Sequence, residues 1–429
     1  MEMPATVRRH RLESMKTLKR IFFMALLIAF VANVSACKIS PTISSPRQSD
    51  NLELLLWDSS EIVAIKTRVA HGDPDLKDAL DRLRKEADAA VRIAPLSVMD
   101  KKGVPPSGNR HDYMSLSIYY WPDPNEANGM PYIRRDGEVN PESNSDYYDK
   151  ASLSHMVSAV TTLSLAYYYT GDEQYSAHAA KLLKTWFLDP ATQMNPNLQY
   201  AQGIPGKNSG EPGGIIDSVG FLDVVDDASF LQGSNNWTSS DQKALESWFR
   251  AYLIWLQDSA FGKAESAATN NHGTWYDTQI AAFALFTGQV DLATGILKST
   301  VPGRIESQIE PDGRQLLELS RTRSLHYSLY NLEAFVSLSM LGEHLGIDLW
   351  HYSTSDGRSI GKALEFVLPG LNGSQWEYPE IGSQDYSSFA SYLCRASKYY
   401  PEQNYLSTVD KLLGDTARSS RLNLLCSRR

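Results

Sequence analysis

The chain has 429 residues, of which 42% are hydrophobic and 21% are charged, and its formal net charge is −9 at pH 7. This acidic balance argues against nucleic acid as a partner, because binding to a phosphate backbone requires a broad basic surface. An anionic substrate stays possible, since a cleft can be locally positive on an acidic protein. The length fits one large domain or two fused ones.

The N-terminal residues have the pattern of an export signal. Basic residues up to Arg20 precede an apolar run over residues 21–31, which is too short to span a bilayer comfortably. Small residues then lead to the sequence Val-Ser-Ala-Cys ending at Cys37, which indicates a lipoprotein signal peptide (1–36) with Cys37 lipidated. The alternative is ordinary secretion with Cys37 as an incidental thiol.

The residues after the lipobox indicate where the chain is held. Lys38 stands where an inner-membrane lipoprotein would often carry Asp, so we expect an outer-membrane-anchored lipoprotein or a periplasmic protein of a Gram-negative bacterium. Residues 37–51, rich in Ser and Pro, would form a flexible tether, and residues 52–429 the folded domain. We expect a monomer that contacts the membrane only through its lipid anchor.

Two cysteines remain in the folded part of the chain. In an oxidising compartment Cys394 and Cys426 could pair and tie the C-terminal tail to a helix over residues 387–399. Two separate buried thiols are an equal alternative.

Apolar residues recur at three- and four-residue spacing through most of the chain, whereas strand-like alternation is scarce. Tight breaks at Gly171-Asp172 and Gly288-Gln289 indicate antiparallel neighbours. This pattern predicts an all-α fold, an α/α toroid built as an incomplete barrel of antiparallel helix hairpins with long loops at one mouth. Helices are expected at residues 74–93, 150–169, 172–187, 239–259, 272–287, 324–345, 360–368 and 387–399.

Two non-helical stretches, 101–144 and 195–214, are far longer than ordinary connections, which indicates that they are functional. The first is rich in aromatic residues, which suit stacking on sugar rings, and in arginines, which suit carboxylates. The alternative is a packed Ω-like loop. The candidate substrate-binding residues in these stretches are His111, Tyr113, Tyr120, Trp121, Arg134, Arg135 and Gln202.

Asn270-Asn271-His272 lies directly before a predicted helix. A helix N-terminus favours negative charge nearby and tends to keep an imidazole neutral. The amides and the imidazole could therefore bind a sugar carboxylate. Alternatively, one asparagine is only an N-cap and His272 a satisfied core histidine, which this segment taken alone would favour.

A second segment, 318–332, contains arginines and tyrosines. If residues 321–341 are helical, Arg323, Tyr327 and Tyr330 fall on one face. An arginine close to a tyrosine stabilises the phenolate, which would make that phenol a credible base near neutral pH. The alternative is an arginine stacked on structural tyrosines. Arg321 would lie ahead of the first turn and point into the cleft independently.

These motifs, taken in order, resemble those of the alginate-lyase-like polysaccharide lyases, which have a helical toroid. The resemblance covers most of the chain after the signal peptide. It implies that Asn271, His272 and Arg321 neutralise a uronate carboxylate and that Tyr327, rather than Tyr330, handles protons. The matching elements are His111-Asp-Tyr-Met-Ser115, Tyr120-Trp-Pro-Asp-Pro124, Tyr132-Ile-Arg-Arg-Asp-Gly-Glu-Val-Asn140, Tyr200-Ala-Gln202, Asn270-Asn-His-Gly-Thr-Trp-Tyr276 and Arg321-Thr-Arg-Ser324 followed by Tyr327-Ser328.

The resemblance also bears on the neighbouring residues. Helical geometry favours Arg323 where the resemblance favours Arg321, so the catalytic arginine stays open. Residues 208–214 depart from the family pattern, because Glu211 stands where a further basic residue is expected. The remaining candidate substrate-binding residues are Asn270, Tyr276, Arg323 and Tyr330.

The function implied is β-elimination in a polyuronate, with alginate the first substrate and glucuronan the next. We expect no cofactor, and no metal, because no set of His, Asp or Glu has ligand spacing. One alternative is a toroidal glycoside hydrolase acting on uronates, which would need two cleft carboxylates from Asp112, Glu211 and Asp217. Another is a non-catalytic surface lipoprotein that binds glycans.

Overall fold

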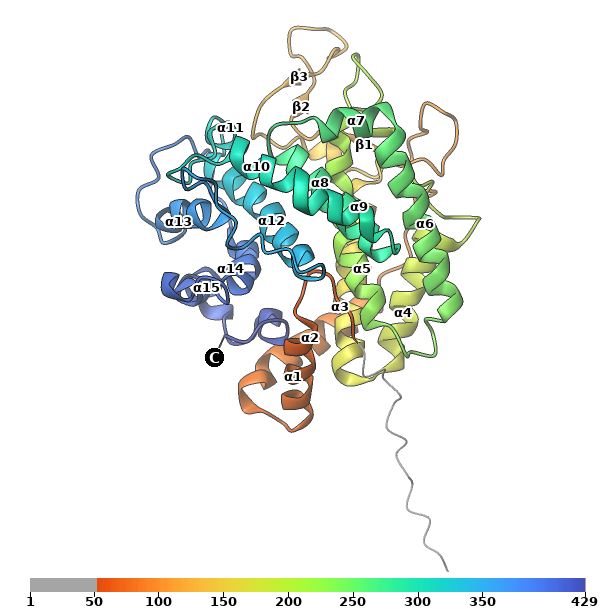
Figure 1. Ribbon diagram of the computed structural model, residues 1–429. Helices are drawn as coiled ribbons and strands as arrows, with labels where there is room; N and C mark the ends of the chain where they lie inside the picture. The colour runs from red at the N-terminus through yellow and green to blue at the C-terminus, as the bar shows by residue number, and fades with distance from the viewer. Residues whose placement is uncertain (1–51, 429) are drawn as a thin grey trace, which may run out of the picture. The chain divides into compact units, whose positions relative to one another are not determined.

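The computed structural model describes residues 52–428 (Figure 1). All of them belong to one unit, Pro46–Arg429. The predicted signal peptide (1–36), the tether (37–51) and Cys37 lie outside the described residues. Within the described range, no helix is both long enough and apolar enough to cross a bilayer.

Helices dominate the described residues, as predicted, and each of the expected helices is present with its ends shifted by a few residues. Several further helices, such as α5 and α15, were not among those expected. The helices are α1 (Ser59–Ala70), α2 (Pro74–Ala90), α3 (Lys150–Thr170), α4 (Glu173–Leu183), α5 (Phe221–Phe230), α6 (Ser239–Asp258), α7 (Ala260–Ser266), α8 (Asn271–Phe286), α9 (Val290–Gly295), α10 (Val301–Gln308), α11 (Leu316–Leu319), α12 (Ser324–Glu343), α13 (Ile360–Leu371), α14 (Ala390–Ala396) and α15 (Tyr405–Leu413).

The helices form an α/α toroid in which neighbours along the chain pack as antiparallel pairs, such as α3 with α4. Helix α3 ends at Gly171, whose φ of +69° gives the left-handed cap that glycine adopts without strain. Asp172 then caps α4 by accepting a hydrogen bond from Gln174 N. The predicted break at Gly171-Asp172 is therefore confirmed.

Helices α8 and α12 pack against each other and lie side by side in Figure 1. Both are buried along most of their length, which explains why neither has a one-sided apolar stripe. Their N-terminal ends, at Asn271 and Ser324, carry the two segments that the sequence singled out.

The two long loops meet through short strands. Strand β1 (Met114–Leu116) pairs in parallel with β4 (Tyr200–Gly203), and β2 (Tyr120–Trp121) pairs antiparallel with β3 (Ile133–Arg134). A buried ion pair of 3.0 Å between Lys101 and Asp149 ties the start of the first loop to the N-terminus of α3. The loops are thus fixed structure beside the ends of α3, α8 and α12.

The C-terminal tail joins the end of the chain to its first helices. Cys394 in α14 and Cys426 form a disulfide, which settles the alternative that the sequence left open. The short 3-10 helix Arg421–Leu424 packs on α2. Nearby, the Ser427 amide donates to Glu61 Oε1 of α1 at 2.6 Å. These contacts connect the last helices of the toroid to the first.

Candidate active site

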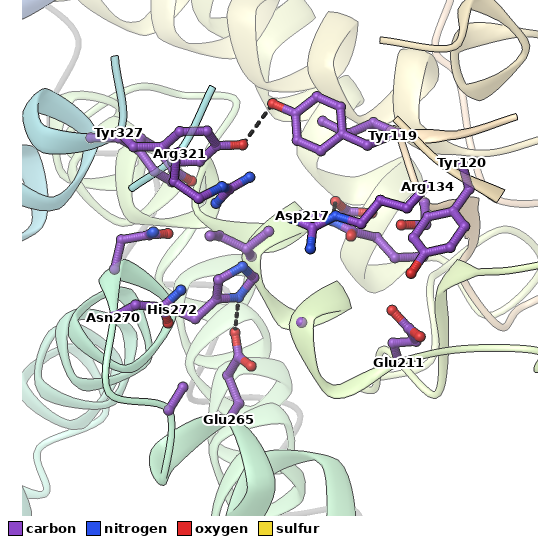
Figure 2. Close-up of a pocket in the computed structure, with 18 of the residues that line it drawn as sticks. Tyr119, Tyr120, Arg134, Glu211, Asp217, Glu265, Asn270, His272, Arg321 and Tyr327 are labelled. Atoms are coloured by element: carbon purple, nitrogen blue, oxygen red, sulfur yellow. Dashed lines mark hydrogen bonds and ion pairs between the residues drawn. The ribbon is translucent and has the colours of Figure 1, made fainter. Parts of the chain in front are cut away.

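A cavity of about 550 Å³ opens where the two long loops meet the N-terminal ends of α8 and α12. Figure 2 shows side chains from both loops and both helices directed into it. The predicted site residues that line it are Tyr120, Arg134, Gln202, Asn270, Asn271, His272, Arg321, Tyr327 and Tyr330.

Asn271 is held by a buried carboxylate. Its backbone N and its Nδ2 donate to the two oxygens of Glu318, each at 2.7 Å. Burial raises the pKa of Glu318 above its ordinary value, and the hydrogen bonds from Asn271 offset only part of that rise. Asn270 is the N-cap residue of α8, yet its side chain makes no capping hydrogen bond. The Asn270 amide is therefore available to the cavity, and a simple capping role does not describe it.

His272 forms a 2.6 Å hydrogen bond from Nδ1 to Glu265 Oε1 (Figure 2). Burial alone would lower the pKa of His272, but the hydrogen bond and the charge of Glu265 outweigh it and leave the pKa above its ordinary value. The helix N-terminus alone favours a neutral imidazole, and this carboxylate acts in the opposite direction. With Nδ1 occupied by Glu265, Nε2 is the nitrogen left for a ligand.

Arg321 lies flat against Tyr327. Its guanidinium carbon is 3.6 Å from the ring centroid, and the Tyr327 hydroxyl donates to the Tyr119 hydroxyl at 2.7 Å. Burial and the neighbouring Tyr119 raise the pKa of Tyr327 well above its ordinary value, and the positive charge of Arg321 offsets only part of this. The sequence argument for a ready phenolate left out this burial. The raised pKa favours the phenol form of Tyr327.

The position of α12 distinguishes the two arginines. The helix begins at Ser324, so Arg323 is its N-cap residue and does not share a helical face with Tyr327 and Tyr330. Arg323 lies away from the cavity, where its backbone bridges to Glu380. Arg321, ahead of the first turn, lines the cavity. The geometry thus agrees with the resemblance and not with the helical-face argument.

The opposite wall of the cavity, seen in Figure 2, carries Tyr119, Tyr120, Arg134, Glu211 and Asp217. Asp217 is almost wholly buried, and it accepts hydrogen bonds from the first loop, including one of 2.5 Å from Ser115 Oγ, and from Gln202 Nε2 at 2.9 Å. Its oxygens thus hold the loops together.

The other two carboxylates suggested for hydrolysis, Glu211 and Asp112, are each held by a hydrogen bond. Glu211 accepts from Asn208 Nδ2 at 3.0 Å, and Asp112, which is outside the cavity lining, accepts from Asn195 Nδ2 at 2.7 Å. All three carboxylates accept hydrogen bonds from neighbouring side chains, so they do not form the free pair that a glycoside hydrolase requires.

Several predicted site residues lie outside the cavity lining, each for a local reason. His111 Nδ1 bonds to the carbonyl of Gln193 at 2.6 Å, and the buried Tyr276 hydroxyl donates to the carbonyl of Leu256 at 2.9 Å. Tyr113 is fully buried behind Asp217. Trp121 and Arg135 stack on each other, with 5.3 Å between the guanidinium carbon and the ring. With Arg323, these side chains support the loops and helix ends around the site.

The sequence reasoning missed other residues that the fold brings to the cavity. Glu265 comes from a segment with no motif of its own, whereas Glu318, the first residue of the 318–332 segment, lies behind Asn271 and outside the cavity lining. Lys150 lines the cavity from the first turn of α3, and His326 stacks parallel to the ring of Tyr330. Tyr119 could have been found, because it stands beside Tyr120 in the aromatic run. The cavity thus combines five cationic or protonatable nitrogen groups, from Arg134, Lys150, His272, Arg321 and His326.

A family model described as alginate lyase matches residues 97–376, which is more than half of the chain. The chain belongs to the alginate lyase family. It is a polysaccharide lyase, as the resemblance implied. A search of curated proteins gave no match.

Solved structures of this family share the fold. An alginate lyase from Bacteroides ovatus is 37% identical to the chain, with a TM-score of 0.83 over 87% of this chain and 99% of that one. A variant of alginate lyase A1-III without ligand is 16% identical with a TM-score of 0.50, over 85% and 94% of the two chains. The same variant with a tetrasaccharide is 17% identical with a TM-score of 0.51 over the same shares. The two A1-III structures show likeness in fold alone.

Proposed function

We propose that this lyase cleaves a polyuronate by β-elimination in the cavity between α8 and α12, with alginate the first substrate and glucuronan the next. The observation that carries the proposal is the convergence of Asn271, His272 and Arg321 beside Tyr327. The first three supply hydrogen-bond donors and positive charge, and Tyr327 supplies a group that exchanges protons. The B. ovatus relative is an alginate lyase, which supports the choice of substrate.

The reaction needs the proton on C5 of a uronate, which is poorly acidic while the neighbouring carboxylate is charged. Donors at Asn271, His272 and Arg321 would stabilise the enolate-like intermediate that forms when this proton leaves. Removing one such donor typically costs about 10²–10³ in rate. The raised pKa of His272 supports this role, because a protonated imidazole donates and carries positive charge.

Tyr327 would move the protons. As phenolate it takes the proton from C5; the C4–O4 bond breaks as the C4=C5 double bond forms, and the resulting phenol protonates O4 of the leaving sugar. One residue can do both when the two groups lie on the same side of the ring. If they lie on opposite sides, His272 could serve as base once deprotonated. Because its raised pKa favours the phenol, Tyr327 must first lose a proton to solvent, and each transfer to O4 then regenerates the phenolate for the next cycle.

The test is an incubation with mannuronate-rich and guluronate-rich alginate and with glucuronan, monitored by ultraviolet absorbance. An unsaturated sugar end that appears with wild type, and is lost with His272→Ala and Tyr327→Phe, supports the proposal. A reducing end derived from water would indicate hydrolysis. No turnover of any polyuronate by wild type would overturn it in favour of another polysaccharide.

We further propose export to the outer membrane through a lipid on Cys37, with the domain acting as a monomer. The support is the signal pattern before Cys37 and the residue Lys38 after it. Expression in a Gram-negative host with a labelled fatty acid tests the lipid. Label on wild type but not on Cys37→Ser supports anchoring, and an unlabelled soluble periplasmic protein contradicts it.

A further inference from the structure

Asp136 connects two arginines of the cavity without lining the cavity itself. It lies two residues after β3. Its Oδ1 accepts hydrogen bonds from Nη2 of Arg321 and from Nη2 of Arg134, both at 2.6 Å. Its Oδ2 accepts from Nε of Arg321 at 3.2 Å. One carboxylate therefore holds two cations that a polyuronate would contact.

This contact decides which part of Arg321 is free. A guanidinium has five N–H groups, and Asp136 occupies the edge formed by Nε and Nη2. One face of the guanidinium is covered by the ring of Tyr327, at 3.6 Å. Within residues 52–428, Nη1 has no hydrogen-bond partner. The Nη1 edge is thus the part of Arg321 that can bind a substrate carboxylate.

Asp136 also fixes the loop that carries it. Oδ2 accepts from the Thr322 hydroxyl at 2.9 Å, and the backbone carbonyl of Asp136 accepts from the same hydroxyl at 3.0 Å. The next residue, Gly137, has a φ of +80°, and a Cβ there would lie 2.5 Å from Thr322 Oγ1. The turn is therefore built against the segment that precedes α12.

The same turn positions Tyr119. The amide of Arg135 donates to the carbonyl of Tyr119 at 2.8 Å, so the start of the β2–β3 hairpin is tied to the turn that Asp136 anchors. Tyr119 in turn accepts the hydroxyl hydrogen of Tyr327. Asp136 thus helps to position both Arg321, which covers the ring of Tyr327, and Tyr119, which accepts the Tyr327 hydroxyl hydrogen.

The charge of Asp136 opposes substrate binding. Burial would raise the pKa of Asp136, but the hydrogen bonds and charge of Arg321 outweigh it and hold the pKa well below its usual range, so the carboxylate is charged at neutral pH. A fixed negative charge between two cations weakens the attraction of the cavity for a polyanion. A residue whose only role was to bind a polyanion would not carry a negative charge.

We propose that Asp136 is a positioning residue of the lyase, which aims the Nη1 edge of Arg321 at the uronate carboxylate and holds the hairpin at the cavity, while it lowers affinity for the polyanion. The inference rests on the proposed function. It predicts effects of opposite sign on kcat and on substrate binding, which a merely structural residue would not produce.

The test compares Asp136→Asn, which removes the charge and keeps the shape, with wild type. We expect kcat to fall about 10–100-fold, because small misplacements of a catalytic group have effects of this size. We expect KM for a polyuronate to fall, and to depend more steeply on salt concentration. Asp136→Glu keeps the charge but not the geometry, so kcat should fall without the gain in affinity.

The matched control is Asp312→Asn. Asp312 also pairs with an arginine, with 2.7 Å from Oδ2 to Nε of Arg314, but this pair is exposed and lies outside the cavity. Its kinetics should equal those of wild type. Thermal unfolding identifies the folded variants, and kcat of Asp136→Glu tests the positioning role if Asp136→Asn does not fold.

Three outcomes overturn the inference. A folded Asp136→Asn or Asp136→Glu variant with kcat within about twofold of wild type removes the positioning role. A folded Asp136→Asn variant with an unchanged or raised KM removes the proposed effect of the charge on affinity. If wild type turns over polyuronates, either of these results contradicts this inference alone. If wild type shows no turnover, the proposed function fails and the inference fails with it.

Discussion

Glu265 and His272 share a hydrogen bond of 2.6 Å in which the carboxylate is only 5% exposed while the imidazole is 28% exposed to the cavity. The carboxylate is therefore shielded from solvent and the imidazole is presented to the ligand. Glu265 orients the imidazole and raises its pKa. The protonation of His272 therefore depends on a carboxylate that a substrate would hardly contact.

Replacing Glu265 by Gln should lower the pH at which activity stops rising. The proposed cycle needs His272 protonated and Tyr327 ionised, so log kcat/KM rises with pH until His272 begins to lose its proton, and then levels off. Glu265→Gln removes the hydrogen-bonded charge that raises the pKa of His272. The bend in a pH–rate profile should therefore move to lower pH. An unchanged bend in this variant would show that His272 does not set it.

Replacing Tyr327 by Phe should reduce kcat by about 10²–10⁴-fold, the usual contribution of a residue that transfers protons. Binding should persist, because Asn271, His272 and Arg321 are untouched. Stopped assays on folded protein measure kcat, and calorimetry with an unreactive oligouronate measures binding. Tyr330→Phe is the matched control: this tyrosine also lines the cavity, and its ring packs on Trp275 with 5.1 Å between centroids. Equal losses in the two variants would argue against a special role for Tyr327.

Replacing Gly213 by Ala should impair turnover more than stability. A Cβ at this position would lie 3.0 Å from Cε1 of His272, so the imidazole would have to shift away from its place beside Glu265. We expect about a 10–100-fold loss of kcat/KM, given the sensitivity of catalysis to small displacements. Gly295→Ala is the control, since a Cβ there meets nothing within 4 Å. Full activity of the Gly213 variant would show that the ring tolerates the contact.

Replacing both Cys394 and Cys426 by Ser should lower the free energy of unfolding by about 2–4 kcal/mol, the usual contribution of a disulfide. The two cysteines are separated by 32 residues in sequence, so the crosslink restricts a long segment of the unfolded chain. Urea unfolding with and without reductant measures the effect. Reductant should bring wild type to the stability of the variant and leave the variant unchanged. A reductant-insensitive wild type would contradict the prediction.

The sequence was informative where the signal is local. Recurring apolar residues in 272–287 and 324–345, together with the break at Gly288, located α8 and α12, although burial on all sides leaves neither helix a one-sided apolar stripe. The motif at Asn270–His272 and the segment around Arg321 then lie at adjacent helix ends, since the two helices pack together. The principal cavity residues could be named for this reason.

The sequence was less informative where a property depends on distant residues. The choice between Arg321 and Arg323 turns on whether α12 starts at Ser324 or a turn earlier, which spacing alone does not decide. The charge on His272 depends on Glu265 in another helix, and the phenol state of Tyr327 depends on how deeply the fold buries it. The residues next to a side chain in sequence do not show how deeply the fold buries it or which partner another element brings to it.

The segment 421–427 completes the packing of the first two helices. Its 3-10 helix at Arg421–Leu424 packs on α2, and Ser427 contacts α1, so helices made at the start of synthesis lack part of their packing surface until the end. A product cut short before residue 421 would retain the residues of the cavity but expose this surface on α2 and leave Cys394 without its partner. Such a chain would be a substrate for proteases and chaperones. Residues 421–427 are thus a condition of stability, although they lie far from the residues that perform the chemistry.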